Sequence, residues 1–232
     1  MLKEKKYIII EGLIGSGKTS LCKKLKERTD IFGDIKVHLE PAENTNPYLD
    51  KYYKEPEKYS FNMQIFLLGK RFRAHTAAQA GVLNGDYTVI SDRSYWGDRC
   101  FAEIQKKLGY FSEDDYNTYM SLHKDMQRFL LYPSACIFLD TGVDLAMKRI
   151  ARRQSEIEGR ECECAITKDY MTMLNNEIVR MIDSFSNYCP VLKIKPLKED
   201  GSEKTLEELS KEVIDYVINL NHNVYDAWQG VL

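Results

Sequence analysis

Short apolar runs rich in β-branched residues alternate along the chain with longer segments whose apolar residues recur at helical spacing. The spacing predicts helices at about 18–29, 60–83, 95–108, 113–130, 144–155, 167–187 and 205–220. Strands that alternate with helices are typical of a parallel sheet covered on both faces, so the pattern predicts an α/β fold. The predicted strands are Tyr7–Glu11, Ile35–Leu39, Tyr87–Ser91, Ala135–Leu139 and Val191–Ile194.

Length and composition favour one globular domain over residues 1–232. Of the 232 residues, 44% are hydrophobic and 29% are charged, which excludes a disordered or fibrous chain. The net charge of -2 provides no overall basic field, so we expect neither nucleic acid nor a membrane as a partner. No apolar run approaches the roughly 18 residues of a membrane helix, and the first strand begins too early for a signal peptide. We therefore expect a cytosolic or nuclear protein, and assign it to the cytoplasm.

The six cysteines are dispersed over the chain, which argues against a disulfide framework. Cys162 and Cys164 form a C-x-C pair, but no second Cys or His pair stands at zinc-ligand spacing. We expect reduced thiols rather than a metal site.

The segment after the first predicted strand reads G-L-I-G-S-G-K-T and matches the phosphate-binding pattern G-x-x-x-x-G-K-S/T. Its position between a strand and a helix is the context in which backbone N–H groups and a helix N-terminus surround a phosphate. Lys18 is expected to reach the β- and γ-phosphates, and the Thr19 hydroxyl to bind Mg²⁺. The predicted ATP-binding residues are Gly12, Leu13, Ile14, Gly15, Ser16, Gly17, Lys18 and Thr19.

Several observations narrow the class of nucleotide-binding protein. The chain contains no N-K-x-D motif, which disfavours a guanine-binding switch, and it is short for a motor or transport ATPase. A small-molecule kinase is therefore the leading interpretation. Glu40, Asp92 and Arg93 follow the second and third strands, whose carboxyl ends lie beside the nucleotide in a doubly wound sheet. As structural alternatives, Glu40 could cap a turn, and Asp92 with Arg93 could form an ion pair.

Six motifs together resemble the deoxyribonucleoside kinase family, especially the bacterial deoxyadenosine and deoxyguanosine kinases and the deoxycytidine/deoxyguanosine kinase branch. They are G-L-I-G-S-G-K-T, L-E-P, N-P-Y-L, Y-Y-K-E-P-E-K-Y-S-F-N-M-Q, D-R-S and G-R-E-C-E. The resemblance implies a P-loop kinase fold with a five-stranded parallel sheet, flanking helices and an arginine-rich lid. It implies a homodimer that uses ATP and Mg²⁺ to phosphorylate the 5′-hydroxyl of deoxyribonucleosides in nucleotide salvage.

The resemblance also implies roles for the acceptor-side residues. Glu40 would be the general base for the 5′-hydroxyl, Arg93 would hold the transferring phosphoryl group, and Asp92 would join Thr19 around magnesium. Tyr53 and Glu163 would bind the 3′-hydroxyl. The base would be read by Gln64, Arg71 and Asp98, with Phe101 and Phe61 as stacking candidates. Arg71 and Asp98 favour purine deoxynucleosides or deoxycytidine over thymidine.

The expected lid spans about 149–165 and departs from the compact family pattern. Residues 154–158 separate Arg149, Arg152 and Arg153 from Gly159-Arg160, so which of them reaches the γ-phosphate stays open. We assign Arg149, Arg153 and Arg160 to ATP binding. The loop at 198–205 is expected near the adenine, and the helices at about 60–83 and 113–130 at the dimer interface.

Two other functions remain as alternatives. Thymidylate kinase has the same fold, but its family has a glycine-rich continuation after E-P, where this chain reads Ala42-Glu-Asn-Thr-Asn-Pro47. A catalytically silent P-loop subunit is the less favoured alternative, because Lys18, Thr19, Glu40, Asp92 and Arg93 are all present.

Overall fold

The chain folds around a five-stranded sheet in the order β2-β3-β1-β4-β5, and every strand pairs in parallel with its neighbours. The computed structural model describes residues 4–40, 46–156 and 166–220. The strands are β1 (Tyr7–Gly12), β2 (Ile35–His38), β3 (Thr88–Asp92), β4 (Ala135–Leu139) and β5 (Val191–Ile194). The predicted α/β fold with a five-stranded parallel sheet is confirmed.

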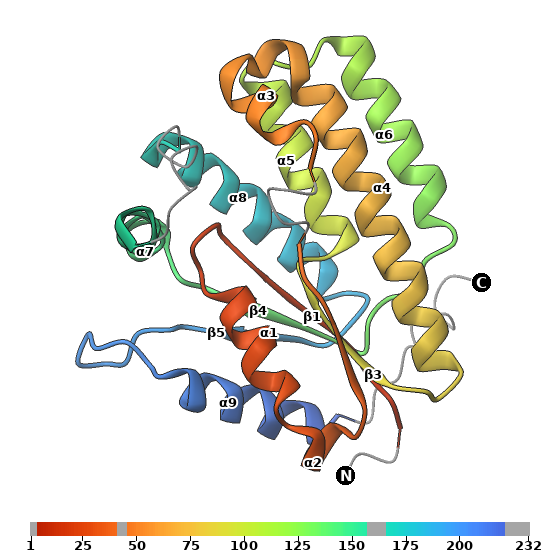
Figure 1. Ribbon diagram of the computed structural model, residues 1–232, viewed down its shortest axis with the longest axis vertical. Helices are drawn as coiled ribbons and strands as arrows, with labels where there is room; N and C mark the ends of the chain where they lie inside the picture. The colour runs from red at the N-terminus through yellow and green to blue at the C-terminus, as the bar shows by residue number, and fades with distance from the viewer. Residues whose placement is uncertain (1–3, 41–45, 157–165, 221–232) are drawn as a thin grey trace.

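Helices cover both faces of this sheet (Figure 1), with α1 and α9 on one side and α4, α5 and α8 on the other. The helices are α1 (Lys18–Lys26), α2 (Thr29–Phe32), α3 (Leu49–Lys54), α4 (Pro56–Leu83), α5 (Tyr95–Lys107), α6 (Glu113–Gln127), α7 (Val143–Glu156), α8 (Lys168–Phe185) and α9 (Leu206–Ile218). The short helices α2 and α3 were not predicted, because they are too short to show a period. Helix α4 begins earlier than predicted, at Pro56, where proline favours a first helical turn.

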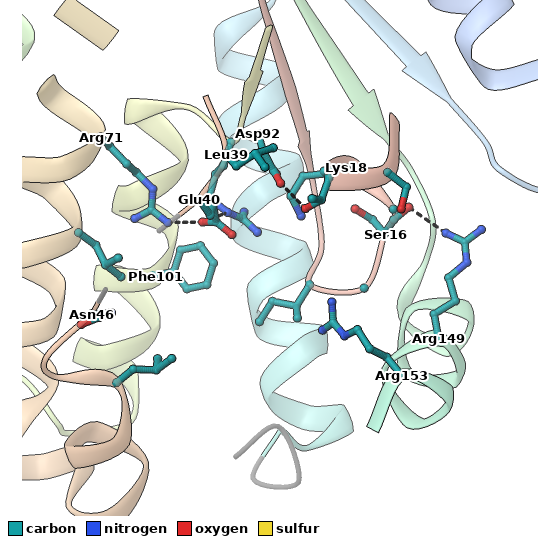
Figure 2. Close-up of a pocket in the computed structure, with 18 of the residues that line it drawn as sticks. Ser16, Lys18, Leu39, Glu40, Asn46, Arg71, Asp92, Phe101, Arg149 and Arg153 are labelled. Atoms are coloured by element: carbon teal, nitrogen blue, oxygen red, sulfur yellow. Dashed lines mark hydrogen bonds and ion pairs between the residues drawn. The ribbon is translucent and has the colours of Figure 1, made fainter. Parts of the chain in front are cut away.

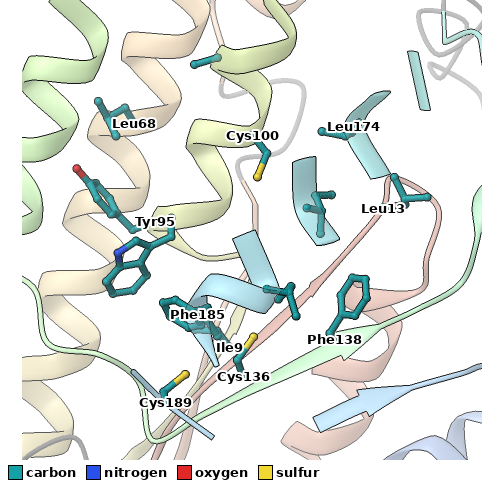
Figure 3. Close-up of a cluster of buried hydrophobic side chains, with 14 of the residues drawn as sticks. Ile9, Leu13, Leu68, Tyr95, Cys100, Cys136, Phe138, Leu174, Phe185 and Cys189 are labelled. Carbon is teal, nitrogen blue, oxygen red and sulfur yellow. The ribbon is translucent and has the colours of Figure 1, made fainter. Parts of the chain in front are cut away.

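Two buried clusters hold these layers together. On one face, Ile9, Cys136 and Phe138 of the sheet pack with Leu68 of α4, and Figure 3 shows further members from α5 and α8. On the other face, Ile8 and Ile10 pack with Leu21 of α1 and Val213 of α9. Because β1 alternates its side chains between the two clusters, both of its faces are apolar, as expected for a central parallel strand.

Two expectations from the sequence concern the cysteines, expected as reduced thiols, and membrane helices, of which none was expected. Cys22, Cys100, Cys136 and Cys189 are buried and unpaired, and the Cys162/Cys164 pair lies outside the described residues. Among the helices of the described ranges, none is long and apolar enough to cross a membrane.

Candidate active site

A cavity of about 750 Å³ opens at the carboxyl edge of the sheet, where β1, β2 and β3 end. Parallel pairing brings these ends together, since Ile10 of β1 is opposite Asp92 of β3, and His38 of β2 is opposite Ser91. Helices α4 and α5 supply one wall, and α7 with the loop after β5 supplies another. The sequence-predicted residues that line the cavity are Ile14, Gly15, Ser16, Gly17, Lys18, Thr19, Glu40, Tyr53, Gln64, Arg71, Asp92, Arg93, Phe101, Arg149 and Arg153.

The loop between β1 and α1 has the conformation that a phosphate cradle requires. Gly15 has a φ of 76°, and a Cβ at this position would lie 2.8 Å from the carbonyl oxygen of Ala146, so only glycine fits. Gly17, with a φ of 97°, leads directly into α1, so the N-terminal N–H groups of the helix face the loop. Gly12 and Leu13 do not line the cavity and form the buried base of this loop.

Lys18 lies folded against the same loop. Its Nζ donates hydrogen bonds to the carbonyl oxygens of Gly12 at 3.2 Å and Leu13 at 2.7 Å. Burial and the neighbouring Arg93 charge lower the pKa of Lys18 to about 8, against the opposing effect of Asp92. A bound triphosphate would add negative charge beside this ammonium, and would therefore favour its protonated form.

Glu40 lies between the phosphate-loop side of the cavity and the wall formed by α4 and α5 (Figure 2). Its Oε1 accepts hydrogen bonds from Arg71 Nη2 at 2.5 Å and from Arg93 Nε at 2.8 Å. Burial raises the pKa of this carboxyl, but the charges of Arg93, Arg71 and Lys18 outweigh it and lower the pKa to about 2. Because both arginines bind Oε1, the second oxygen is the one left for an acceptor hydroxyl.

Asp92 and Thr19 form a site that fits Mg²⁺. Thr19 Oγ1 donates a hydrogen bond to Asp92 Oδ2, whereas the buried Oδ1 of Asp92 has no hydrogen-bond partner in the described structure. An orphaned carboxylate oxygen beside a hydroxyl and a phosphate loop suits a cation that keeps most of its ligands as water and phosphate oxygens. No cluster of three or more His, Cys, Asp or Glu side chains that could hold a metal occurs among the residues described.

The opposite wall holds a buried polar network centred on Asp98. Its Oδ2 accepts hydrogen bonds from Gln64 Nε2 at 2.8 Å and Tyr119 Oη at 2.6 Å, and its Oδ1 binds Arg71 Nη1. Asp98 is fully buried and does not line the cavity, so the predicted direct contact of its carboxylate with a base is not supported. Gln64 Oε1 is buried without a hydrogen-bond partner among the described residues, and Arg71 reaches from Asp98 to Glu40.

Of the two candidates for base stacking, only Phe101 lies at the cavity. The Cζ atom of Arg93 lies 4.8 Å from the Phe101 ring centroid. Phe61 was predicted wrongly, because it packs edge-on against Phe111 in the apolar cluster, with 5.7 Å between ring centroids. The face of α4 that carries Phe61 packs against the core. The spacing of apolar residues alone does not show which face of a helix meets the core and which meets the cavity.

The beginning of the expected lid reaches the phosphate loop. Arg149 and Arg153 both extend from α7 toward it (Figure 2), and Arg149 Nη1 donates to the carbonyl oxygen of Ser16 at 2.8 Å. The remainder of the lid, with Arg160 and Glu163, lies outside the described residues.

Several cavity residues were missed by the sequence analysis. Glu203, in the loop expected near adenine, accepts hydrogen bonds from Arg149 Nε and Nη2 at 3.1 and 2.8 Å. Tyr52 Oη accepts a hydrogen bond from Gln105 Nε2 at 3.0 Å, and both line the cavity. Tyr52 begins the motif Y-Y-K-E-P-E-K-Y-S-F-N-M-Q without a role assigned to it, and no motif contains Gln105, which Tyr52 meets from α3 across 53 residues of sequence.

Comparisons with known proteins give consistent results. The sequence profile of a family described as deoxynucleoside kinase matches residues 8–220. The chain is 31% identical over 188 residues to the deoxyadenosine kinase of Dictyostelium discoideum, covering 81% of this chain and 71% of that protein. It is 30% identical over 219 residues to the deoxyadenosine/deoxycytidine kinase of Bacillus subtilis, covering 93% of each. A solved structure of deoxyadenosine kinase from M. mycoides, with products dCMP and dCDP, matches with a TM-score of 0.73 at 23% identity, covering 91% of this chain and 98% of that one. At this identity, the structural match shows a shared fold.

Proposed function

This chain belongs to the deoxynucleoside kinase family, as the resemblance of its motifs predicted, and we propose that it phosphorylates the 5′-hydroxyl of deoxyadenosine, deoxyguanosine or deoxycytidine. The family match gives no support to the alternative of a thymidylate kinase. The observation that carries the proposal is the placement of Lys18, Glu40 and Arg93 in one cavity, with Gln64 and Arg71 on its opposite wall. A silent subunit would have no need to keep these groups together.

Glu40 and Arg93 would act on the two partners of the reaction. Glu40 Oε2 would accept the proton of the 5′-hydroxyl while the 5′-oxygen of the nucleoside attacks the γ-phosphorus of ATP. The bond between the γ-phosphorus and the bridging oxygen of the β-phosphate would break, and ADP would leave. Arg93 and Lys18 would stabilise the negative charge on the transferring group. A carboxyl with its pKa lowered to about 2 is a weak base, so proton transfer would accompany phosphoryl transfer rather than precede it.

The base would be recognised by Gln64 and Arg71, whose side chains line the cavity. Gln64 Oε1, which has no hydrogen-bond partner in the described part of the chain, can accept a hydrogen bond from an exocyclic amine of adenine, guanine or cytosine. Thymine has no such amine. Asp98 would orient Gln64 and Arg71 through its hydrogen bonds to them, without lining the cavity itself. Phe101 would stack on the base, and Tyr53 would bind the 3′-hydroxyl.

Thr19 and Asp92 would hold Mg²⁺ together with the phosphates. When bound, the ion would neutralise charge on the phosphate oxygens. Arg149 and Arg153 would contribute to the ATP site, as would Arg160 in the undescribed part of a lid at about 149–165. Glu163, in the same undescribed part, would join Tyr53 at the 3′-hydroxyl.

We also propose that residues 1–232 act as one kinase domain that dimerises through α4 and α6. Support comes from the exposure of large apolar side chains on or beside these helices: Leu83, Leu122 and Phe129, of which Phe129 is 70% exposed. Sedimentation of the wild type and of Phe129→Asp tests this surface, with a shift from dimer to monomer expected only in the variant. The buried free thiols agree with a cytoplasmic enzyme, and the reaction class agrees with nucleotide salvage.

The experiment that tests the function is ATP-dependent phosphorylation of four deoxynucleosides and dTMP by the wild type and Glu40→Gln. We expect activity on deoxyadenosine, deoxyguanosine or deoxycytidine, and a loss of about 100-fold or more in the variant. Glu57→Gln makes the same chemical change at an exposed site on α4 and is expected to keep full activity. Exclusive use of thymidine would contradict the base assignment, and the absence of any phosphorylated nucleoside would refute the function.

A further inference from the structure

A fully buried carboxylate that does not line the cavity lies directly behind Arg93. This residue is Glu11, the last but one residue of β1. Its Oε1 accepts a hydrogen bond from the backbone N–H of Ser94 at 2.7 Å. Its Oε2 lies 3.5 Å from Arg93 Nη1. Burying a carboxylate costs free energy unless charge and hydrogen bonds compensate it, and here the compensating charge is Arg93.

The first turn of α5 is shaped to admit this carboxylate. A Cβ on Gly97 would lie 2.3 Å from Glu11 Oε1 and 3.0 Å from its Cδ, so the absence of a side chain at Gly97 leaves room for the carboxylate. Ser94 caps the helix by accepting a hydrogen bond from Gly97 N at 2.8 Å. Glu11 therefore places a negative charge at the N-terminus of α5, where it is electrostatically favourable.

Arg93 itself has an unusual backbone conformation. Its φ is 77°, and no other non-glycine residue in the described ranges has a positive φ. Such a conformation is unfavourable for arginine and persists only where the surroundings hold it. The Arg93 N–H donates to the carbonyl oxygen of Ile10 at 2.9 Å, and the guanidinium lies between Glu40 in front and Glu11 behind.

We propose that Glu11 is the positioning residue of Arg93, holding its guanidinium in the orientation needed for phosphoryl transfer. The inference rests on the proposed function. Glu40 becomes neutral when it accepts the hydroxyl proton. Arg93 then loses its charged partner on the cavity side during transfer of the negatively charged phosphoryl group. Glu11 takes no proton in this step, and it remains as the charge that keeps Arg93 aligned.

Glu11→Gln tests the proposal because it keeps an acceptor for Ser94 N, removes the negative charge and replaces the oxygen beside Arg93 Nη1 with an NH₂ group. We expect kcat to fall about 10- to 100-fold, the cost of misplacing a catalytic group, with the nucleoside KM changed less than about threefold. In an Arg93→Ala background, the same substitution is expected to change kcat by less than about twofold, because Glu11 acts through Arg93. An equal loss in both backgrounds, or no loss in the wild-type background, would overturn the inference.

Gly97→Ala provides a second route that leaves Glu11 chemically intact. The added methyl displaces the Glu11 carboxylate, so kcat is expected to fall with little change in nucleoside KM. Gly69→Ala is the matched control, since an added Cβ on Gly69 in α4 meets no described residue within 4 Å beyond its chain neighbours and the adjoining helix backbone, and it is expected to retain wild-type kcat. Equal kcat in the two glycine variants would count against the proposal even if Glu11→Gln fails to fold. Inactive wild-type enzyme would refute the proposed function, whereas active wild type with unaffected Glu11 and Gly97 variants would refute this inference alone.

Discussion

Asp98→Asn isolates the role of a buried charge that does not line the cavity. The substitution keeps the shape of the side chain but replaces one carboxylate oxygen with an NH₂ group. Both oxygens of Asp98 accept hydrogen bonds, one from Arg71 and the other from Gln64 and Tyr119. Whichever oxygen is replaced, a donor then faces a donor, and the network must lose at least one hydrogen bond.

The size of the effect follows from the bond that is lost. A hydrogen bond to a charged group contributes about 1.5–3 kcal/mol, and each 1.4 kcal/mol corresponds to about tenfold. The upper part of the range applies here because Asp98 is fully buried and Arg71 is only 8% exposed. With Arg71 and Gln64 no longer fixed, kcat/KM for the nucleoside is expected to fall about 40- to 150-fold.

The assay is ADP release at varied deoxyadenosine and saturating ATP, repeated at varied ATP and saturating deoxyadenosine. The KM for ATP is expected to change by less than about twofold, because Asp98 has no contact with the phosphate loop. Asp125→Asn makes the same change at an exposed position of α6 and is expected to leave both constants unaltered. A melting temperature for each variant shows how much of any loss reflects stability.

A nucleoside kcat/KM within twofold of wild type would refute the reasoning, since the orientation of Arg71 and Gln64 would then not depend on Asp98. A parallel rise in the KM for ATP would also refute it. That result would indicate a general loosening of the cavity rather than a local effect on the base side.

Three further predictions concern the phosphate side. Arg93→Ala is expected to lower kcat about 100- to 1000-fold with little change in nucleoside KM, and unchanged turnover would contradict its role. Glu203→Ala is expected to raise the KM for ATP by at most about fivefold at constant kcat, because its ion pair with Arg149 is partly exposed; steady-state kinetics at varied ATP measures this. Since deprotonation of Lys18 removes a phosphate-binding charge and burial lowers its pKa to about 8, kcat/KM for ATP should fall as pH rises through about 8. A profile from pH 6.5 to 9.5 that stays flat would be inconsistent with this assignment.

The positions of the candidate catalytic groups along the strands were predictable from sequence. A phosphate loop must follow a strand and begin a helix, and residues directly after parallel strands share one edge of the sheet. For that reason the strand pattern predicts that Lys18, Glu40, Asp92 and Arg93 lie close together, and the fold brings them into one cavity. The family resemblance added Gln64 and Arg71, which no periodicity of the helix would have selected.

Only the tertiary structure decided which charged groups pair. Arg71 of α4 bridges Glu40 after β2 and Asp98 of α5, and Glu11 of β1 supports Arg93 after β3. The same packing placed Phe61, partly buried, against the core cluster and left Phe101 at the cavity. Local sequence determines whether a segment forms a helix or a strand, because those preferences and periods are short in range. Which faces of two elements meet depends on packing between residues far apart in the chain, and this is where the charge network of the site is set.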